Sequence, residues 1–124
     1  MSQRAFVIIF LVWMMATLAL SQNPCSAGKM WTNYNAMKAA NCRNCDKYFH
    51  CQGNYEAVRN CRGILQVATA TAISNLREWA QGNDTPDSAA DQAANVYGRN
   101  GGNCAGRYLG AVNCKWNPRT KKCG

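Results

Sequence analysis

Apolar residues recur every three or four positions in four stretches of the chain, and polar or turn-forming residues separate these stretches. This spacing places the apolar side chains on one face of a helix. It predicts helices over about 26–41, 46–59, 64–81 and 85–97. No stretch alternates with the two-residue period of a strand for long enough to predict a sheet. We therefore expect an all-α fold, a small four-helix bundle followed by an irregular C-terminal tail.

The same spacing predicts which side chains are buried. Each helix should turn its apolar face toward the others, because burial of these faces stabilises a bundle. The predicted buried residues are Met30, Trp31, Tyr34, Met37 and Asn41 in the first helix, Tyr48, Cys51, Tyr55 and Val58 in the second, Leu65, Ala68, Ala72, Ile73, Leu76, Trp79 and Ala80 in the third, and Ala90, Ala93, Ala94 and Tyr97 in the fourth.

Capping residues and glycines indicate where the helices begin and end. Side-chain oxygens that can accept from free backbone N–H groups favour a helix start. The expected N-caps are Ser26, Asp46 and either Thr85 or Asp87. Gly98 is expected to stop the fourth helix. Gly53 lies inside the second helix, where glycine costs roughly 1 kcal/mol relative to alanine, and it indicates the close approach of a neighbouring backbone.

The N-terminal segment has a different pattern. An apolar run over 5–20 follows Arg4 and ends in small residues that suit cleavage before Gln22. This predicts a secretory signal peptide over 1–21 and a secreted protein. A membrane anchor is the alternative, but the run is shorter than the roughly 20 residues that span a bilayer.

The remaining chain divides into a helical part and a basic tail. We expect the helical bundle over 22–97 and the tail, packed on it, over 98–124. The formal net charge of the chain is +8, and loss of Arg4 with the signal peptide would reduce it to +7. The tail contains no acidic residue. A basic surface attracts polyanions with an affinity that falls as salt screens it, although a merely solvated basic face is the alternative.

The cysteines indicate a disulfide framework, because an even, high number in a short secreted chain is typical of one. The eight are Cys25, Cys42, Cys45, Cys51, Cys61, Cys104, Cys114 and Cys123. Five precede residue 62 and three follow residue 103, so complete pairing requires at least one bridge between the groups. The shortest such bridge, Cys61 to Cys104, would contribute on the order of 4 kcal/mol. The tail is therefore expected to be stapled to the helices, while the spacing leaves the connectivity open.

The sequence gives little support for a metal site, a cofactor or an enzyme. The spacing of Cys42, Cys45, His50 and Cys51 suggests a zinc site, but the second short-spaced ligand pair is missing. We therefore expect no metal site and no cofactor. His50, the only histidine, is expected to be a hydrogen-bonded structural residue and not a metal ligand or pH switch. Scattered carboxylates and the absence of a nucleophile with an adjacent base argue against an enzyme.

Four motifs, taken in order, resemble the serum amyloid A family. They are MWTNYNAMKAAN from Met30, DKYFHCQGNYEA from Asp46, AISNLRE from Ala72 and DSAADQAANVYGRNG from Asp87. The chain is similar to a cysteine-rich, N-terminally shortened, invertebrate-type member. It lacks the phenylalanine-rich segment that precedes the first motif in the family. A basic, cysteine-bearing tail replaces the family's proline-rich tail.

The resemblance implies a small secreted four-helix bundle wrapped by its tail. It also implies association with lipids and lipoproteins, binding of heparan sulfate-type polyanions, carriage of apolar ligands such as retinol, and a role in innate immunity. Arg59 and Arg77 match basic positions of the family's second and third helices.

Our first functional hypothesis is a secreted acute-phase-type protein that recognises anionic surfaces: heparan sulfate, lipid or lipoprotein, or a bacterial surface. Apolar small molecules are further candidate ligands, and a homo-oligomer is a further candidate state. The expected polyanion-binding residues are Arg59, Arg77, Arg107, Lys115, Arg119, Lys121 and Lys122. The alternatives are a membrane-active antimicrobial protein and a cytokine-like signal. We expect neither nucleic-acid binding nor a transmembrane segment.

Overall fold

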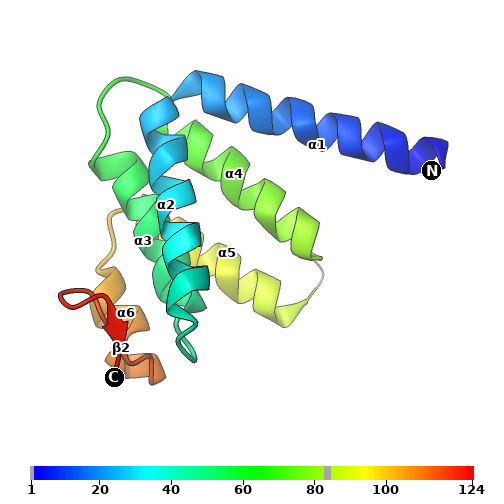
Figure 1. Cartoon of the computed structure of the whole chain (residues 1–124). Coiled ribbons are helices and arrows are strands. Elements are labelled where there is room, and N and C mark those ends of the chain that lie inside the picture. Colours follow the sequence, from blue (N-terminus) through cyan, green and yellow to red (C-terminus); the bar gives the residue numbers. More distant parts are fainter. Residues whose placement is uncertain (1, 83–84) are drawn as a thin grey trace.

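The computed structural model describes residues 2–82 and 85–124, with backbone alone for 15–21. The chain is mostly helical, as predicted (Figure 1). In chain order its elements are α1 (Gln3–Gln22), α2 (Pro24–Ala40), α3 (Asp46–Arg59), α4 (Gln66–Gln81), α5 (Pro86–Arg99), α6 (Cys104–Tyr108), the 3₁₀ turn η1 (Gly110–Val112), β1 (Trp116–Asn117) and β2 (Lys122–Cys123).

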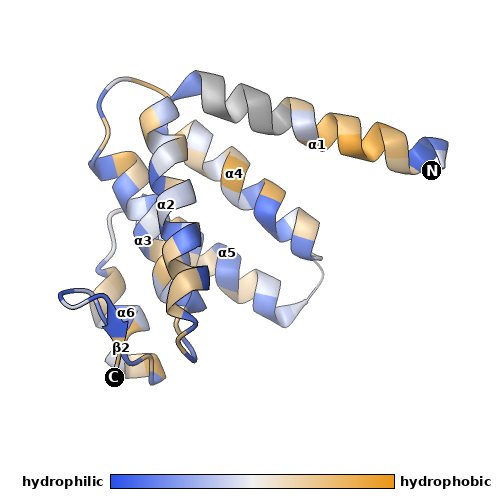
Figure 2. Cartoon of the chain, viewed as in Figure 1, coloured by the Kyte–Doolittle hydropathy of each residue, from blue (hydrophilic) through white to orange (hydrophobic). Residues whose placement is uncertain are grey.

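The predicted signal peptide forms α1, which contacts α4 and α2 and extends away from the other helices at its N-terminal end (Figure 1). The first half of α1 is strongly hydrophobic (Figure 2). Its large side chains are exposed: Phe6 is 65% and Phe10 is 52% accessible. Among the described residues, no helix combines the length and hydrophobicity that crossing a membrane requires. Cleavage before Gln22 stays a prediction.

Helix α3 lies at the centre of the fold and contacts α2, α4, α5 and α6. The larger apolar core forms between α3, α5 and the tail. Its buried members are Cys45, Tyr48, Phe49, Cys51, Ala94, Cys104, Tyr108 and Cys114. Phe49 also packs edge-on against Trp116, with ring centroids 5.2 Å apart. A smaller cluster of Met30, Ala57 and Ala70 joins α2, α3 and α4. Four cysteines of the larger core are thus both hydrophobic contacts and covalent links.

The start of α2 was placed wrongly by the sequence pattern. Its N-cap is Asn23, whose Oδ1 accepts from the Ser26 N–H at 3.0 Å, and not Ser26. The Asn23 amide nitrogen also donates to the carbonyl of Ile64 at 3.0 Å, so one side chain caps α2 and holds the chain before α4. Ser26 is buried inside the helix, and its hydroxyl donates to the Ala57 carbonyl at 2.6 Å.

The other helix boundaries were predicted more closely. Cys45 and not Asp46 is the N-cap of α3, and it has no side-chain capping bond, so Asp46 is the first helical residue. Helix α4 begins at Gln66 because Leu65 has a positive φ of 66°. Thr85 caps α5 as predicted, accepting from the Ser88 N–H at 3.1 Å. Gly82 ends α4 with a φ of 90°.

Gly98 lies within α5, which contradicts the prediction that it stops the helix. A Cβ atom at this position would lie 2.0 Å from the backbone oxygen of Cys51. Gly98 therefore permits contact between the backbones of α5 and α3. Gly53 has a milder constraint, because a Cβ there would lie 3.2 Å from the Cβ atom of Asn33. The nearest neighbour of Gly53 is therefore a side chain, and not a backbone as predicted.

The buried face of α4 was predicted wrongly, and in α5 only Ala94 is fully buried as predicted. Thr69, Ala70, Ser74 and Glu78 are the buried residues of α4, and its apolar stripe lies instead at the surface or only partly covered. In α5, Ala90 and Ala93 are exposed, while Ser88, Asp91, Ala94, Asn95 and Gly98 are buried. The reason is a polar interior between α3, α4 and α5, where hydrogen bonds compensate for the loss of water.

The tail contains short regular elements, which the sequence pattern did not predict. Asn103 caps α6 by accepting from the Gly106 N–H at 3.0 Å. After η1, β1 and β2 pair antiparallel, with Trp116 opposite Cys123. The tail contacts α3 through α6 (Figure 1).

All eight cysteines form disulfides: Cys25–Cys61, Cys42–Cys123, Cys45–Cys114 and Cys51–Cys104. The predicted link between the two cysteine groups is confirmed, and three bridges provide it. Cys61 pairs with Cys25, so the shortest linking bridge is not used. Cys45 lies at the start of α3, and Cys51 lies inside the helix.

Candidate binding surfaces and the polar interior

An apolar groove runs between α2 and α4 and has a volume of about 610 Å³. Its lining residues are Ala27, Met30, Trp31, Tyr34, Ile73, Leu76, Arg77, Ala80 and Gln81. Trp31, on the α2 side, is 64% exposed. The groove thus accounts for part of the α4 apolar stripe: Ile73, Leu76 and Ala80 line an open surface and not the interior.

Arg77 is the cation of the groove. Its guanidinium lies 4.1 Å from the centroid of the Tyr34 ring, and Lys38 approaches the same ring at 5.2 Å. Burial lowers the pKa of Arg77 from its ordinary value. Within the described residues, Nε and Nη2 of Arg77 are buried without a hydrogen-bond partner. The groove therefore combines apolar walls with positive charge around Tyr34.

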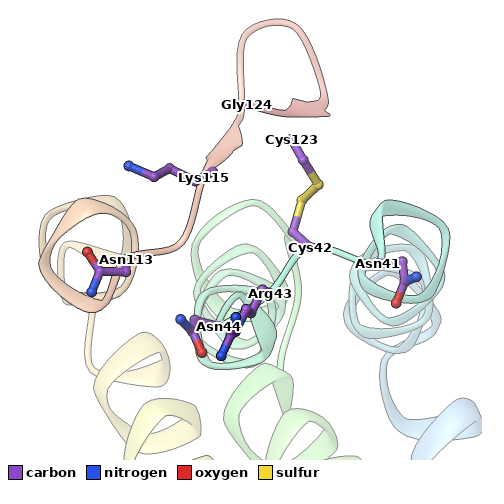
Figure 3. A pocket seen from close by; sticks show the side chains of 8 residues that line it. All are labelled: Asn41, Cys42, Arg43, Asn44, Asn113, Lys115, Cys123 and Gly124. Carbon is purple, nitrogen blue, oxygen red and sulfur yellow. A yellow bond between two sulfur atoms is a disulfide. The ribbon is translucent and has the colours of Figure 1, made fainter.

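A second hollow, which we call the tail cleft, lies where the β1–β2 hairpin meets the loop between α2 and α3 (Figure 3). Its volume is about 680 Å³. The Cys42–Cys123 bridge lies in its wall and joins the loop to the hairpin (Figure 3). Arg43 from the loop and Lys115 from the tail bring positive charge to it. The remaining lining residues are Asn41, Asn44, Asn113 and Gly124.

The seven predicted polyanion-binding residues do not form one surface. Lys115, Arg119, Lys121 and Lys122 share the hairpin segment, and Arg77 belongs to the groove. Arg59 is exposed at the other end of α3, where its Nη2 lies 3.5 Å from the Asn100 carbonyl oxygen. Arg107 stacks on Tyr97 at 4.6 Å from the ring centroid.

Arg43 was missed as a candidate. It precedes α3 in sequence but joins the tail cleft only through the pairing of Cys42 with Cys123. Because the sequence left that pairing open, the presence of Arg43 in the same cleft as Lys115 could not be predicted.

The interior between α3, α4 and α5 contains ionisable side chains. Lys47 forms ion pairs with Asp46 at 2.7 Å, with Asp87 at 2.8 Å, and with Asp91. Burial alone would lower the pKa of Lys47, but hydrogen bonds to the three carboxylates raise it. Burial would raise the pKa of Asp46, but Lys47 holds it below its ordinary value.

His50 and Glu78 lie deeper in the same interior. His50 Nδ1 lies 3.2 Å from Asn95 Oδ1, which confirms a buried, hydrogen-bonded histidine. Burial, followed by the charge of Arg77, lowers the pKa of His50. Burial, followed by the neighbouring carboxylate of Asp91, raises the pKa of Glu78 to about 7.

A hydrogen-bond network completes this interior. The Asn54 amide donates to Asn95 Oδ1 at 3.0 Å, and Ser74 donates its hydroxyl proton to Asn54 Oδ1 at 3.1 Å. Arg99 also donates to Asn54 Oδ1, at 2.9 Å. These bonds explain why α4 and α5 turn polar residues inward.

The comparison with known proteins identifies the family. The sequence profile described as "Serum amyloid A protein" matches residues 18–110, from the end of α1 to the start of η1. The chain belongs to the serum amyloid A family. It is 45% identical over 86 residues to Serum amyloid A protein of Notamacropus eugenii, covering 66% of each chain. It is 50% identical over 78 residues to Serum amyloid A-2 protein of Oryctolagus cuniculus, covering 60% of this chain and 62% of the relative.

The match to the serum amyloid A family covers some features described above and not others. The chain spans just under two thirds of the length of these relatives. Both walls of the groove, on α2 and α4, lie inside the family match. The hairpin with Lys115, Arg119, Lys121 and Lys122 lies beyond it.

Proposed function

We propose that this serum amyloid A-family chain is a secreted, acute-phase-type binding protein that recognises anionic lipid surfaces through the groove between α2 and α4. The observation that carries this proposal is the combination of apolar walls with the positive charges of Arg77 and Lys38 around Tyr34. We infer binding and not catalysis; all eight cysteines are held in disulfides, so none offers a thiol nucleophile.

The two parts of the groove suit the two parts of an amphiphile. Trp31, Ile73, Leu76 and Ala80 offer an apolar surface above the buried side chains of Ala27 and Met30. Covering such a surface with an acyl chain is favourable by roughly 25 cal/mol per Å² of apolar area removed from water. The cations beside Tyr34 favour a phosphate or carboxylate head over a neutral one. The groove is also the expected site for an apolar small molecule, in which case the charge should matter little.

Binding to vesicles tests this proposal. The oxidised chain without residues 1–21 should bind vesicles of phosphatidylserine and phosphatidylcholine more tightly than vesicles of phosphatidylcholine alone. The preference should weaken with salt. Trp31→Ala should weaken binding about tenfold, or ~1.4 kcal/mol, because Trp31 lines the groove.

Trp79→Ala is the matched control. Trp79 is 45% exposed on α4 but does not line the groove, so its removal should leave vesicle affinity unchanged. Equal loss of affinity in both variants, or equal affinity for both vesicle compositions, contradicts the proposal. Leakage of an encapsulated dye would instead favour the antimicrobial function.

A second candidate function is the recognition of sulfated polysaccharide at the tail cleft. Arg43 and Lys115 both line it, and Arg119, Lys121 and Lys122 follow in the acid-free hairpin segment. On heparin resin, Lys115→Gln should elute at lower salt than Arg62→Gln, which removes one exposed cation outside the cleft. Wild-type elution at or below physiological salt would rule out specific recognition.

A further inference from the structure

Three side chains able to ligate a metal converge in the interior from three different helices. They are His50 of α3, Glu78 of α4 and Asp91 of α5, which are 4%, 1% and 3% exposed. One ligand atom of each lies within 4.8 Å of the others. His50 Nε2 lies 3.5 Å from Asp91 Oδ2. None of the three residues lines the groove or the tail cleft, although Arg77 of the groove lies close enough to act on His50 and Glu78.

The surrounding hydrogen bonds determine how His50 faces this group. Asn95 Oδ1 accepts from the Asn54 amide, and Asn95 Nδ2 donates to Gln92 Oε1 at 3.0 Å. The orientation of the Asn95 amide is thereby set, so His50 Nδ1 must donate its proton to Asn95 Oδ1. The neutral ring then presents the lone pair of Nε2 to Asp91.

Glu78 adds an unsatisfied acceptor. Its Oε2 accepts from the Ser88 hydroxyl at 3.3 Å. Its Oε1 is buried and has no hydrogen-bond partner among the described residues. A buried carboxylate oxygen without a donor is costly. Two carboxyl groups and an imidazole lone pair thus meet in the interior of the protein.

We propose that His50, Glu78 and Asp91 bind a divalent transition-metal ion, with zinc as the best fit. Zinc takes imidazole nitrogen and carboxylate oxygen at about 2.0–2.2 Å, which places neighbouring ligands of a tetrahedron about 3.3–3.6 Å apart. The distance of 3.5 Å between His50 Nε2 and Asp91 Oδ2 agrees with this spacing. The bond from Nδ1 to Asn95 is the outer contact that orients a metal-bound histidine.

The charges around the three ligands also favour a divalent cation. Four carboxylates in or beside the cluster face two cations, counted among the described residues. The carboxylates are those of Asp46, Glu78, Asp87 and Asp91, and the cations are Lys47 and Arg77. When Glu78 is ionised, one divalent ion offsets this difference of two charges. The ammonium of Lys47 already binds Asp46, Asp87 and Asp91 Oδ1, so the ion belongs at Asp91 Oδ2 and not among the outer carboxylates.

The single histidine allows a direct test. The oxidised chain without residues 1–21, produced without a histidine tag and stripped with a chelator, is titrated with zinc chloride. Calorimetry should give one ion per chain. The ¹⁵N resonance of His50 Nε2 should shift on binding, while Nδ1 keeps its proton. Zinc should also raise the midpoint of thermal unfolding, because it binds the folded chain preferentially.

Conservative variants separate the buried site from the surface. His50→Gln and Glu78→Gln should each weaken zinc binding at least tenfold. Glu56→Gln, which removes a carboxylate that belongs to neither the three ligands nor the group around Lys47, should leave the affinity unchanged. Circular dichroism checks the fold of each variant. If a variant unfolds, the shift of the His50 resonance in the wild-type chain still tests zinc binding at this site. Unchanged His50 resonances in excess zinc, or equal zinc affinity in wild type and His50→Gln, overturn the proposal.

Discussion

At the residue scale, Gly98 shows how closely two helices of this protein approach each other. Its α-carbon faces the backbone of α3, where any Cβ would meet the oxygen of Cys51 at 2.0 Å. The same stretch of α3 carries the Cys51–Cys104 bridge. Neither α3 nor the tail can therefore shift easily to make room.

Gly98→Ala should destabilise the fold by about 1–3 kcal/mol, the usual cost of overpacking a close contact. Gly28→Ala is the matched control, because a Cβ at position 28 in α2 meets nothing within 4 Å. That change should be neutral or stabilise the protein by up to ~1 kcal/mol, since alanine favours helix more than glycine. Urea unfolding measures both, and equal stabilities for the two variants contradict the predicted backbone contact.

Asn23 is a second single residue with two structural roles. Asn23→Ala removes the cap of α2 and the bond to the Ile64 carbonyl, and should cost roughly 1–2 kcal/mol in unfolding free energy. Asn23→Ser keeps a capping oxygen but is too short to retain the second bond. The unfolding free energy of Asn23→Ser should therefore lie between those of wild type and Asn23→Ala. A serine variant as unstable as the alanine variant would argue against the capping role.

At the element scale, the sequence pattern predicted where the helices lie along the chain, but it did not predict which faces of α4 and α5 are buried. The boundaries of α2–α5 follow from local spacing, which is why most predicted ends lie within a few residues of the observed ones. The buried faces of α4 and α5 depend on partners in other helices. Glu78 is buried because Ser88 and Asp91 of α5 lie beside it, and no feature of α4 alone reveals this. Apolar Ile73 and Leu76 meanwhile line the groove.

The same distinction applies to the candidate sites. The basic character of the hairpin can be read from the sequence, and so can the hydrogen-bonded state of the single histidine. The tail cleft depends on a disulfide pairing, and the cluster around His50 depends on the packing of three helices. The residue pattern of a single helix gives no information about distances between side chains of different helices.

At the scale of the whole molecule, the four bridges differ in their exposure. Both cysteines of Cys45–Cys114 and of Cys51–Cys104 are buried, whereas Cys25 and Cys123 are exposed. A reductant needs access to sulfur. The two exposed bridges should therefore open first during mild reduction.

Stepwise reduction, alkylation and peptide mass spectrometry measure this order. Cys25, Cys61, Cys42 and Cys123 should be alkylated while Cys51 and Cys104 stay protected. Denatured protein supplies the control, since all four bridges should then react at similar rates. Early alkylation of Cys51 in native protein would contradict the packing between α3 and α6.

The pairing pattern also determines what a protease can do to this protein. The Cys25–Cys61 and Cys42–Cys123 loops overlap, so a bridge spans every peptide bond between Cys25 and Cys123. A single cut in that range releases no fragment, and the nicked chain keeps its apparent size on a non-reducing gel. Degradation into free peptides therefore requires more than one cut or a reductant. Outside the cell, where reductants are scarce, a nicked molecule would persist as one covalent unit.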